Sequence, residues 1–179
     1  MPSPKVKRVV LGVCGSIAAY KAGDIIRRLQ DDHCEVMVIM TKTATEFITP
    51  LTLSTLSGKN VYCDMFDKNS WRMAHIELSR AADVVLIAPA TANVIGKLAN
   101  GLADDLLTTF VMTSRAPVLI APAMNDEMYA NQIVRENCAK LKEHGFKFIE
   151  PVKGKLACGT VGIGHLGDID QIVKAVLKA

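Results

Sequence analysis

Four turns along the chain combine small residues with hydroxyl or amide side chains, and each follows a short apolar run. They are Gly15-Ser16, Thr41 with Thr43, Thr91-Ala92-Asn93, and Ala123 with Asn125. Free backbone N–H groups and hydroxyls at such turns bind phosphate groups, and small residues leave room for a flat ring. Taken alone, the first turn is a weak signal, and helix capping explains Thr41 and Thr43 about as well. A single Asn at such a turn is better explained as a turn or cap residue.

The first of these turns favours a mononucleotide over a dinucleotide. Gly15 allows the backbone to approach a phosphate closely, and Ser16 adds a hydroxyl donor. The surrounding sequence is neither GxGxxG nor GxxxxGK[ST], and Met40-Thr41-Lys42-Thr43 lacks the acidic residue that would hold an adenosine ribose. NAD and P-loop nucleotides are therefore disfavoured, and the hydroxyls of Thr41 and Thr43 suit a mononucleotide such as FMN.

The elements that would position these turns alternate between buried strands and helices. Apolar runs without polar alternation predict strands at Val9–Val13, Val36–Met40, Val84–Ala88, Val118–Ala121 and Phe146–Ile149. Helical patterns cover Ile17–Gln30, a shorter pair around Ala44–Leu56, Ala92–Thr113 with a break near Gly101, Gln132–His144 and Asp168–Leu177. This alternation predicts an α/β fold with a doubly wound parallel sheet, flavodoxin-like or Rossmann-like, in a single domain over residues 1–179.

A glycine-rich segment at about residues 152–167, which we call the flap, precedes the last predicted helix. Its glycines are Gly154, Gly159, Gly162, Gly164 and Gly167. Glycine content alone allows either a flap that closes over a site or a plain surface loop.

Composition excludes several classes of protein. The chain has 21 Lys and Arg against 18 Asp and Glu, too even a balance for the dense basic runs of nucleic-acid binders. The five cysteines are widely spaced, so neither a metal site nor a disulfide framework is expected. Since a signal-peptide pattern and a long apolar run are both missing from the sequence, we expect a soluble cytoplasmic protein without membrane contact.

Several longer segments together carry a resemblance to a known family. They are GVCGSIAAYK at 12–21, TPLTL at 50–54, HIELSR at 75–80, APATANVIGKLANGLADDLLTT at 88–109, APAMN at 121–125 and LACG at 156–159. Together they resemble the flavin-containing cysteine decarboxylases, from about Lys7 to Val176. The resemblance implies bound FMN against Gly15, Ser16, Thr41, Thr43, Thr91, Ala92, Asn93 and Ala123.

The resemblance also implies a reaction and the residues that perform it. The family member it favours decarboxylates 4′-phosphopantothenoylcysteine to 4′-phosphopantetheine in coenzyme A biosynthesis, through thioaldehyde and enethiol intermediates. The matching catalytic positions are His75, Asn125 and Cys158, and Asn125, Lys155 and Ala157 would contact the substrate. Without the resemblance, His75 would be a residue at a helix start and Cys158 a buried thiol.

The resemblance leaves open the assembly and three rival functions. Family members form trimers, or dodecamers of trimers, with the site at a subunit contact, so His75 would serve a neighbour's flavin. In many bacteria a phosphopantothenate-cysteine ligase is fused to this domain, so a fused or separate ligase is an expected partner. The rivals are a peptidyl-cysteine decarboxylase, a flavin prenyltransferase and a non-catalytic FMN-binding regulator.

The chain departs from the family pattern at a few positions. Cys14 stands where Thr or Ser is usual, and Val94 ends a motif that normally ends in Thr. In the flap, Thr160 replaces a common acidic residue and His165 replaces a usual Arg. The flap departures affect how the phosphopantothenoyl arm is held more than they affect the chemistry.

Overall fold

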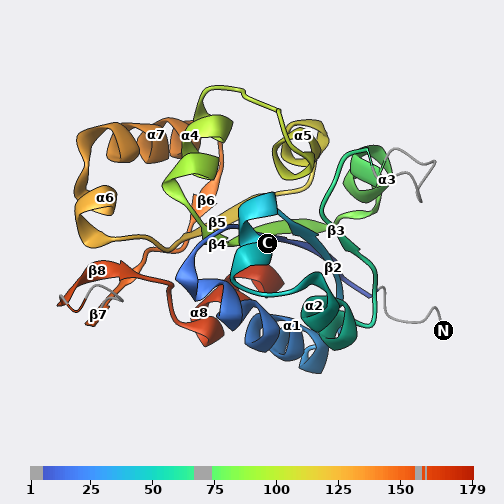
Figure 1. Cartoon of the computed structure of the whole chain (residues 1–179). Helices are drawn as coiled ribbons and strands as arrows, with labels where there is room; N and C mark the ends of the chain where they lie inside the picture. The colour runs from blue at the N-terminus through green and yellow to red at the C-terminus, as the bar shows by residue number, and fades with distance from the viewer. Residues whose placement is uncertain (1–5, 67–73, 156–158, 160) are drawn as a thin grey trace.

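The computed structural model describes residues 6–66, 74–155, 159 and 161–179, and its centre is a six-stranded parallel sheet (Figure 1). The strand order is β3-β2-β1-β4-β5-β6. The strands are β1 Arg8–Val13, β2 Glu35–Met40, β3 Val61–Tyr62, β4 Val84–Ala90, β5 Val118–Pro122 and β6 Lys147–Phe148. This is a doubly wound order, so the predicted fold class is confirmed.

The inner strands carry apolar side chains on both faces, and only a sheet covered on both sides can bury them. This is the pattern typical of parallel strands. Along β1, Val9, Leu11 and Val13 enter one hydrophobic core and Val10 enters the other. All seven residues of β4 and all five of β5 are buried. The two cores lie on opposite faces of the sheet, one under each helical layer.

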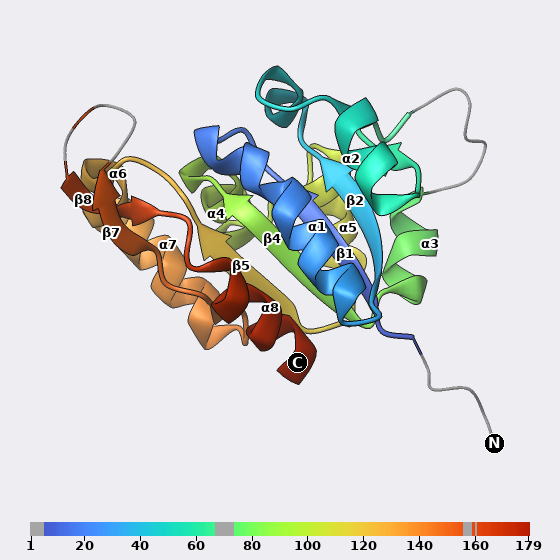
Figure 2. The ribbon, with the colours of Figure 1, turned by 90° about the horizontal axis from the view of Figure 1, so that it is seen from below.

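The helices form those two layers, which Figures 1 and 2 show from two directions. One layer contains α1 Ala22–Asp31, α2 Pro50–Ser57 and α8 Ile169–Lys178, and the other contains α3 Ala74–Ala81, α4 Ala92–Ala99, α5 Leu106–Thr113 and α7 Gln132–Glu143. Short helices follow three strands: η1 Ile17–Lys21, η2 Lys42–Glu46 and α6 Asp126–Ala130. The predicted break between α4 and α5 is present.

The strand order reverses between β1 and β4, and this reversal fixes where a ligand can sit. β1 pairs with β2 on one side and with β4 on the other, all in parallel. The turns after β1, β4 and β5 therefore leave the same edge of the sheet, next to the crevice that opens where the winding changes direction.

Outside the sheet, the flap contains two antiparallel strands, β7 Val152–Lys155 and β8 Val161–His165. β8 lies directly on the turn after β5, because the Met124 N–H donates to the Gly164 carbonyl at 3.1 Å. A side chain at Gly164 would place its Cβ 2.1 Å from the Met124 carbonyl oxygen, so only glycine fits this approach. The hairpin is thereby held against the edge of the sheet that carries the turns.

Among the described residues, every helix falls short of the length and apolar character that crossing a membrane requires. The same part of the chain holds no group of three or more His, Cys, Asp or Glu side chains arranged to bind a metal ion.

Candidate active site

A cavity of about 450 Å³ lies at the crevice where the winding of the sheet reverses. Its walls come from the turns after β1, β4 and β5, from the start of η1, from Phe47 directly after η2, and from the end of β8. They comprise Gly15, Ser16, Ile17, Ala18, Phe47, Thr91, Ala92, Asn93, Ala123, Met124, Asn125, Met128, Gly164, His165 and Leu166. Three of the four turns selected from the sequence thus converge on one cavity.

The turn after β1 is shaped by Gly15. An added Cβ at this position would lie 2.5 Å from Thr43 Oγ1 and 2.6 Å from Thr43 Cβ, so the first and second turns touch here. Ser16 caps η1, and its Oγ accepts a hydrogen bond from the Ala18 N–H at 3.3 Å. The cap fixes the Ser16 side chain at the cavity wall.

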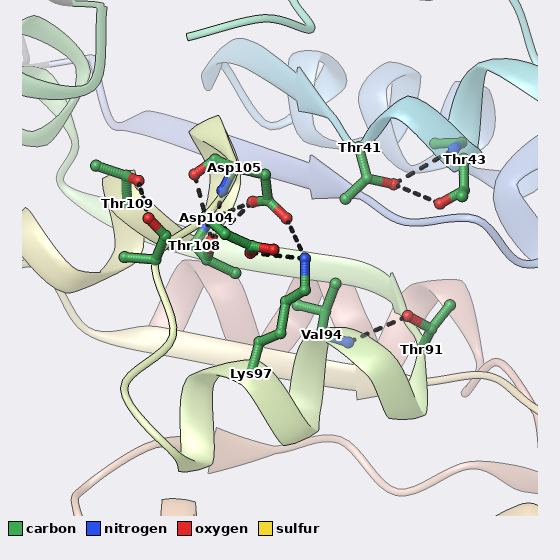
Figure 3. Close-up of polar contacts among 11 residues, drawn as sticks. Thr41, Thr43, Thr91, Val94, Lys97, Asp104, Asp105, Thr108 and Thr109 are labelled. Atoms are coloured by element: carbon green, nitrogen blue, oxygen red, sulfur yellow. Dashed lines mark hydrogen bonds and ion pairs between the residues drawn. The ribbon is translucent and has the colours of Figure 1, made fainter.

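Thr41 and Thr43 follow β2 but do not line the cavity. Thr41 is buried and caps η2, accepting from the Ala44 N–H at 3.3 Å, and the two threonine hydroxyls lie 3.2 Å apart (Figure 3). The sequence allowed either helix capping or cofactor contact for these two threonines, and capping is the role that Thr41 has here. Contact of these two side chains with a cofactor stays a prediction.

The turn after β4 presents the start of α4 to the cavity. Thr91 caps the helix and accepts from the Val94 N–H at 3.4 Å (Figure 3). Ala92 and Asn93 line the cavity next to it. Behind this wall lies Cys14, which is fully buried. Burial raises the pKa of the Cys14 thiol to about 12, against the opposite effect of a hydrogen bond with the Thr91 backbone. Cys14 is therefore a neutral packing group at neutral pH and not a nucleophile.

A charged cluster ties the far end of α4 to α5. Lys97 Nζ lies 2.7 Å from Asp104 Oδ1 and 3.0 Å from Asp105 Oδ2 (Figure 3). Asp105 also caps α5, accepting from the Thr108 N–H and hydroxyl, each at 2.8 Å. The hydrogen bond to Asp104 is the main cause that raises the pKa of Lys97. The cluster holds α4, and with it the cavity wall at Thr91, in one position.

The turn after β5 carries Ala123 and Asn125. Ala123 is buried and donates its N–H to the Ala90 carbonyl at 3.0 Å, which joins this turn to the end of β4. Asn125 caps α6 with its Oδ1, which accepts from the Glu127 and Met128 N–H groups at 3.0 and 3.3 Å. This cap fixes the direction of the Asn125 side chain, whose amide nitrogen is its donor end.

His75 is not brought to the cavity within one chain. It lies near the start of α3, and both views place α3 on the side of the molecule opposite the β7–β8 hairpin. Its Nδ1 is buried and has no hydrogen-bond partner among the described residues. Lys155 ends β7, while Ala157, Cys158 and Thr160 lie outside the described residues, so their predicted roles stay predictions.

Two kinds of cavity residue were not assigned from the sequence. His165 was identified only as a departure from a family pattern, yet its side chain lines the cavity. Ile17 and Phe47 also line it, and they are 60% and 47% exposed. Single apolar residues in turns carry no periodic signal, so nothing in the sequence could mark them as cavity walls.

Comparisons with known proteins cover almost the whole chain. A probable phosphopantothenoylcysteine decarboxylase of Streptococcus mutans is 43% identical over 173 residues, which are 95% of this chain and 97% of that protein. Other curated relatives are named Coenzyme A biosynthesis bifunctional protein CoaBC, and that of Bacillus subtilis is 48% identical over 96% of this chain. The chain spans less than half the length of these bifunctional relatives, 43% in that case.

Solved structures agree with these relatives. A cysteine-to-serine mutant of PPC decarboxylase, complexed with pantothenoylaminoethenethiol, aligns with a TM-score of 0.89 and 35% identity over 97% of this chain and 98% of that one. The FMN binding protein AtHal3 aligns with a TM-score of 0.85 and 35% identity over 97% and 96%. The family model described as Flavoprotein matches residues 2–179. Because that match extends over nearly every residue, the chain belongs to the Flavoprotein family.

Proposed function

We propose that this protein is an FMN-dependent decarboxylase that converts 4′-phosphopantothenoylcysteine to 4′-phosphopantetheine in coenzyme A biosynthesis. The observation that carries the proposal is the alignment with PPC decarboxylase bound to pantothenoylaminoethenethiol, at a TM-score of 0.89 over 97% of the chain. The relative of Streptococcus mutans, which this chain covers almost completely, points to the same reaction.

The described cavity residues fit FMN. Gly15 and Ser16 line the cavity at the first turn, where backbone N–H groups and the Ser16 hydroxyl could meet a phosphate. Ala92 and Ala123 contribute small apolar side chains to the wall, and Thr91 and Asn93 contribute polar ones. When bound, FMN supplies an acceptor for hydride from the substrate and returns the hydride later, so the net redox change is zero.

In this proposal the chain's own residues position the substrate and move its protons. The amide of Asn125 would hold the substrate carboxylate by hydrogen bonding, without a positive charge that would stabilise the carboxylate against loss of CO₂. His75 would act as a base or polar partner near neutral pH. Cys158 would give the proton that completes the final reduction.

The position of α3 supports a homo-oligomer, a trimer or a dodecamer of trimers. Within one chain, α3 and the β7–β8 hairpin lie on opposite sides (Figures 1 and 2). His75 could therefore join the other catalytic positions when α3 of one copy faces the cavity of the next. The buried and unpartnered Nδ1 of His75, judged among the described residues, suits a partner from outside its own chain.

Two further parts of the proposal concern where the protein acts in the cell and which enzyme acts beside it. We place the protein in the cytoplasm, where the pathway of its bifunctional relatives would supply the substrate. A phosphopantothenate-cysteine ligase, fused to this chain or separate, would act alongside it. The relatives of which this chain covers less than half are named bifunctional.

Turnover of defined substrates tests the function. Purified protein is loaded with FMN and incubated with 4′-phosphopantothenoylcysteine, with a peptide ending in cysteine, or with a prenyl phosphate and reduced FMN, and products are identified by mass spectrometry. We expect loss of CO₂ from the first substrate and a product with the mass of 4′-phosphopantetheine. Turnover of only the peptide would instead indicate a peptidyl-cysteine decarboxylase, and turnover of only the prenyl phosphate a flavin prenyltransferase. FMN binding without any turnover would indicate a non-catalytic regulator.

The variant Cys158→Ser tests the last step separately. An unperturbed thiol has a pKa of about 8.5, and a serine hydroxyl is a far weaker acid, so proton delivery should fail. We expect CO₂ loss to continue while a product two hydrogens lighter than 4′-phosphopantetheine accumulates and the flavin stays reduced under anaerobic conditions. Normal product at the wild-type rate would remove Cys158 from the mechanism.

A further inference from the structure

The short helix α6 and the residue before it contribute to the walls of two cavities. Asn125, directly before the helix, lines the active-site cavity, while Tyr129, near its end, lines a second cavity of about 630 Å³ with Lys142 and Glu150. The two cavities share none of the described residues that line them. With five residues, α6 is too short to be stable by itself. Contacts with neighbouring elements must therefore set its direction, and with it the position of Asn125.

Tyr129 connects Asn125 to Glu150. Its N–H donates to the Asn125 carbonyl at 3.0 Å, and its hydroxyl donates to Oε2 of Glu150. Lys142 of α7 holds the other carboxylate oxygen, with its Nζ 2.8 Å from Oε1 of Glu150. The Lys142 and Tyr129 donors lower the pKa of Glu150, while burial, followed by the contact with Glu150, raises the pKa of Tyr129. At neutral pH a protonated phenol therefore donates to an ionised carboxylate, and such charge-assisted hydrogen bonds are the stronger kind.

Glu150 lies where the two ends of the flap come together. The chain enters the flap through Pro151, which is buried, and leaves it at Gly167. An added Cβ at Gly167 would lie 3.1 Å from the Glu150 carbonyl oxygen, so the two ends are in close contact at this residue. The hydrogen bond from Tyr129 therefore ties α6 to the base of the flap.

Helix α6 contacts the flap a second time, through β8. The Met124 N–H donates to the Gly164 carbonyl at 3.1 Å, and an added Cβ at Gly162 would lie 2.0 Å from Oδ2 of Asp126. These contacts hold the start of α6, whereas the hydroxyl of Tyr129 holds its end. Because a helix fixed only at its start could still pivot, the contact at Tyr129 is the one that sets its direction.

We propose that Tyr129 and Glu150 are positioning residues, whose hydrogen bond sets the direction of α6 and so holds Asn125 in place to bind the carboxylate of the substrate. The inference rests on the proposed function, which assigns the carboxylate to Asn125. Neither Tyr129 nor Glu150 lines the active-site cavity, so both act through the helix. Loss of their hydrogen bond would misplace Asn125 without removing it, and small displacements of a group that orients a substrate lower the rate steeply.

The test separates the carboxylate from the rest of the substrate. It compares kcat/KM for 4′-phosphopantothenoylcysteine with the inhibition constant of the product 4′-phosphopantetheine, which has lost the carboxylate, and expresses all rates per bound FMN. In Tyr129→Phe we expect kcat/KM to fall about tenfold, equivalent to about 1.4 kcal/mol, while the inhibition constant keeps its wild-type value. A general loosening of the cavity would change both quantities.

Variants of Glu150 show whether the effect depends on the hydrogen bond. Glu150→Leu removes the acceptor and should lower kcat/KM as much as Tyr129→Phe, and the double variant should lose no more than either single variant. Glu150→Gln keeps an acceptor oxygen and should retain most of the activity. The matched control is Tyr62→Phe on the edge strand β3, which removes the same hydroxyl from a tyrosine outside both cavities and should behave like wild type.

Three outcomes would overturn the inference while leaving the function intact. They are an unchanged kcat/KM in Tyr129→Phe, a rise in the inhibition constant of the product that matches the fall in kcat/KM, and a double variant about a hundredfold below wild type. The last would mean that the two residues act independently. A wild-type protein that does not decarboxylate 4′-phosphopantothenoylcysteine would refute the proposed function, and this inference with it.

Discussion

At the scale of single residues, the turn after β1 depends on the absence of a side chain. Gly15→Ala would place a Cβ 2.5 Å from Thr43 Oγ1 and 3.0 Å from the Thr43 carbonyl carbon, closer than packed atoms approach. Since backbone atoms cannot move aside cheaply, we expect the free energy of unfolding to fall by about 1–3 kcal/mol. FMN affinity should fall too, because the phosphate-facing turn is displaced. Chemical denaturation and flavin titration measure the two effects.

Gly96→Ala is the control for this variant. Gly96 lies inside α4, and an added Cβ there meets Asn137 at an ordinary 3.6 Å. Alanine is favoured over glycine in a helix by about 1 kcal/mol, so this variant should be as stable as wild type or more so. Equal behaviour of the two alanine variants would show that the contact of Gly15 with Thr43 does not shape the site.

Residue types alone could not separate cavity walls from helix caps. Thr41 and Thr91 both follow a buried strand, and both cap the next helix with the side-chain oxygen. The start of α4 faces the crevice between the diverging halves of the sheet, whereas Thr41 turns inward and is buried. That difference depends on strand order, which is a property of the assembled sheet and is invisible in a local pattern.

At the scale of elements, the cluster of Lys97 with Asp104 and Asp105 connects α4 to α5. Burial alone would raise the pKa of Asp105, but hydrogen bonds from the Thr108 backbone and from Lys97 outweigh it and lower the pKa below 3.8. A carboxyl whose pKa is lowered by folding stabilises the fold above its unfolded pKa. That contribution is lost as pH falls through the lower, folded pKa.

Lys97→Met tests this connection. We expect the free energy of unfolding at pH 7 to fall by about 1–2 kcal/mol, since a partly buried, charge-assisted pair is removed. The difference from wild type should shrink below about pH 4, as Asp105 takes up a proton. Urea denaturation across pH measures both, with exposed Lys140→Met of α7 as the control. A difference that does not depend on pH would mean that Lys97 acts through packing alone.

The contact between β8 and the turn after β5 gives a prediction about activity. Gly164→Ala would drive a Cβ to within 2.1 Å of the Met124 carbonyl oxygen and push the hairpin away from Asn125. A shift of about 1 Å in a catalytic position can lower turnover on the order of a hundredfold, and we expect a loss of that size. The thermal midpoint should change little, because β7 and β8 lie outside the six-stranded sheet.

Val161→Ala provides the comparison on the same strand. Val161 is 64% exposed, so its truncation removes few contacts, and turnover should stay near the wild-type value. If Gly164→Ala is as active as Val161→Ala, the position of the hairpin against Met124 has no part in catalysis.

The strands that could be predicted from the sequence are those whose burial on both faces leaves a continuous apolar run. The runs that became β1, β2, β4 and β5 are apolar on both faces, and this is the signal of inner parallel strands. β3 has two residues and pairs only with β2, so its sequence carries no period. β7 and β8 are rich in glycine, which predicts turns more readily than strands, and their pairing depends on contact with the turn after β5.

At the scale of the whole molecule, the separation of α3 from the hairpin predicts shared active sites. Chains carrying His75→Asn are co-expressed, under a different tag, with chains carrying Asn125→Ala, and mixed assemblies are isolated by both tags. Each variant alone should be inactive. If His75 acts on the neighbouring cavity of a trimer, each mixed trimer isolated by both tags should regain about one third of its sites.

The controls distinguish assembly from chemistry. Light scattering should show trimers, or multiples of trimers, for wild type and for the mixture. Two differently tagged populations of His75→Asn chains should assemble equally well and show no activity. A mixture of His75→Asn and Asn125→Ala that assembles normally but stays inactive would place His75 in the site of its own chain or outside the mechanism.

The cavity described above is assembled from segments that are far apart along the chain, from Gly15 after the first strand to His165 near the last helix. Contacts between such distant segments form late in folding, because the loops between them must close first. No fragment that ends before the hairpin can present the complete binding surface. Any ligand held by this cavity therefore binds only the finished fold and shifts the folding equilibrium toward it by mass action. Ligand uptake would thus mark the completion of folding.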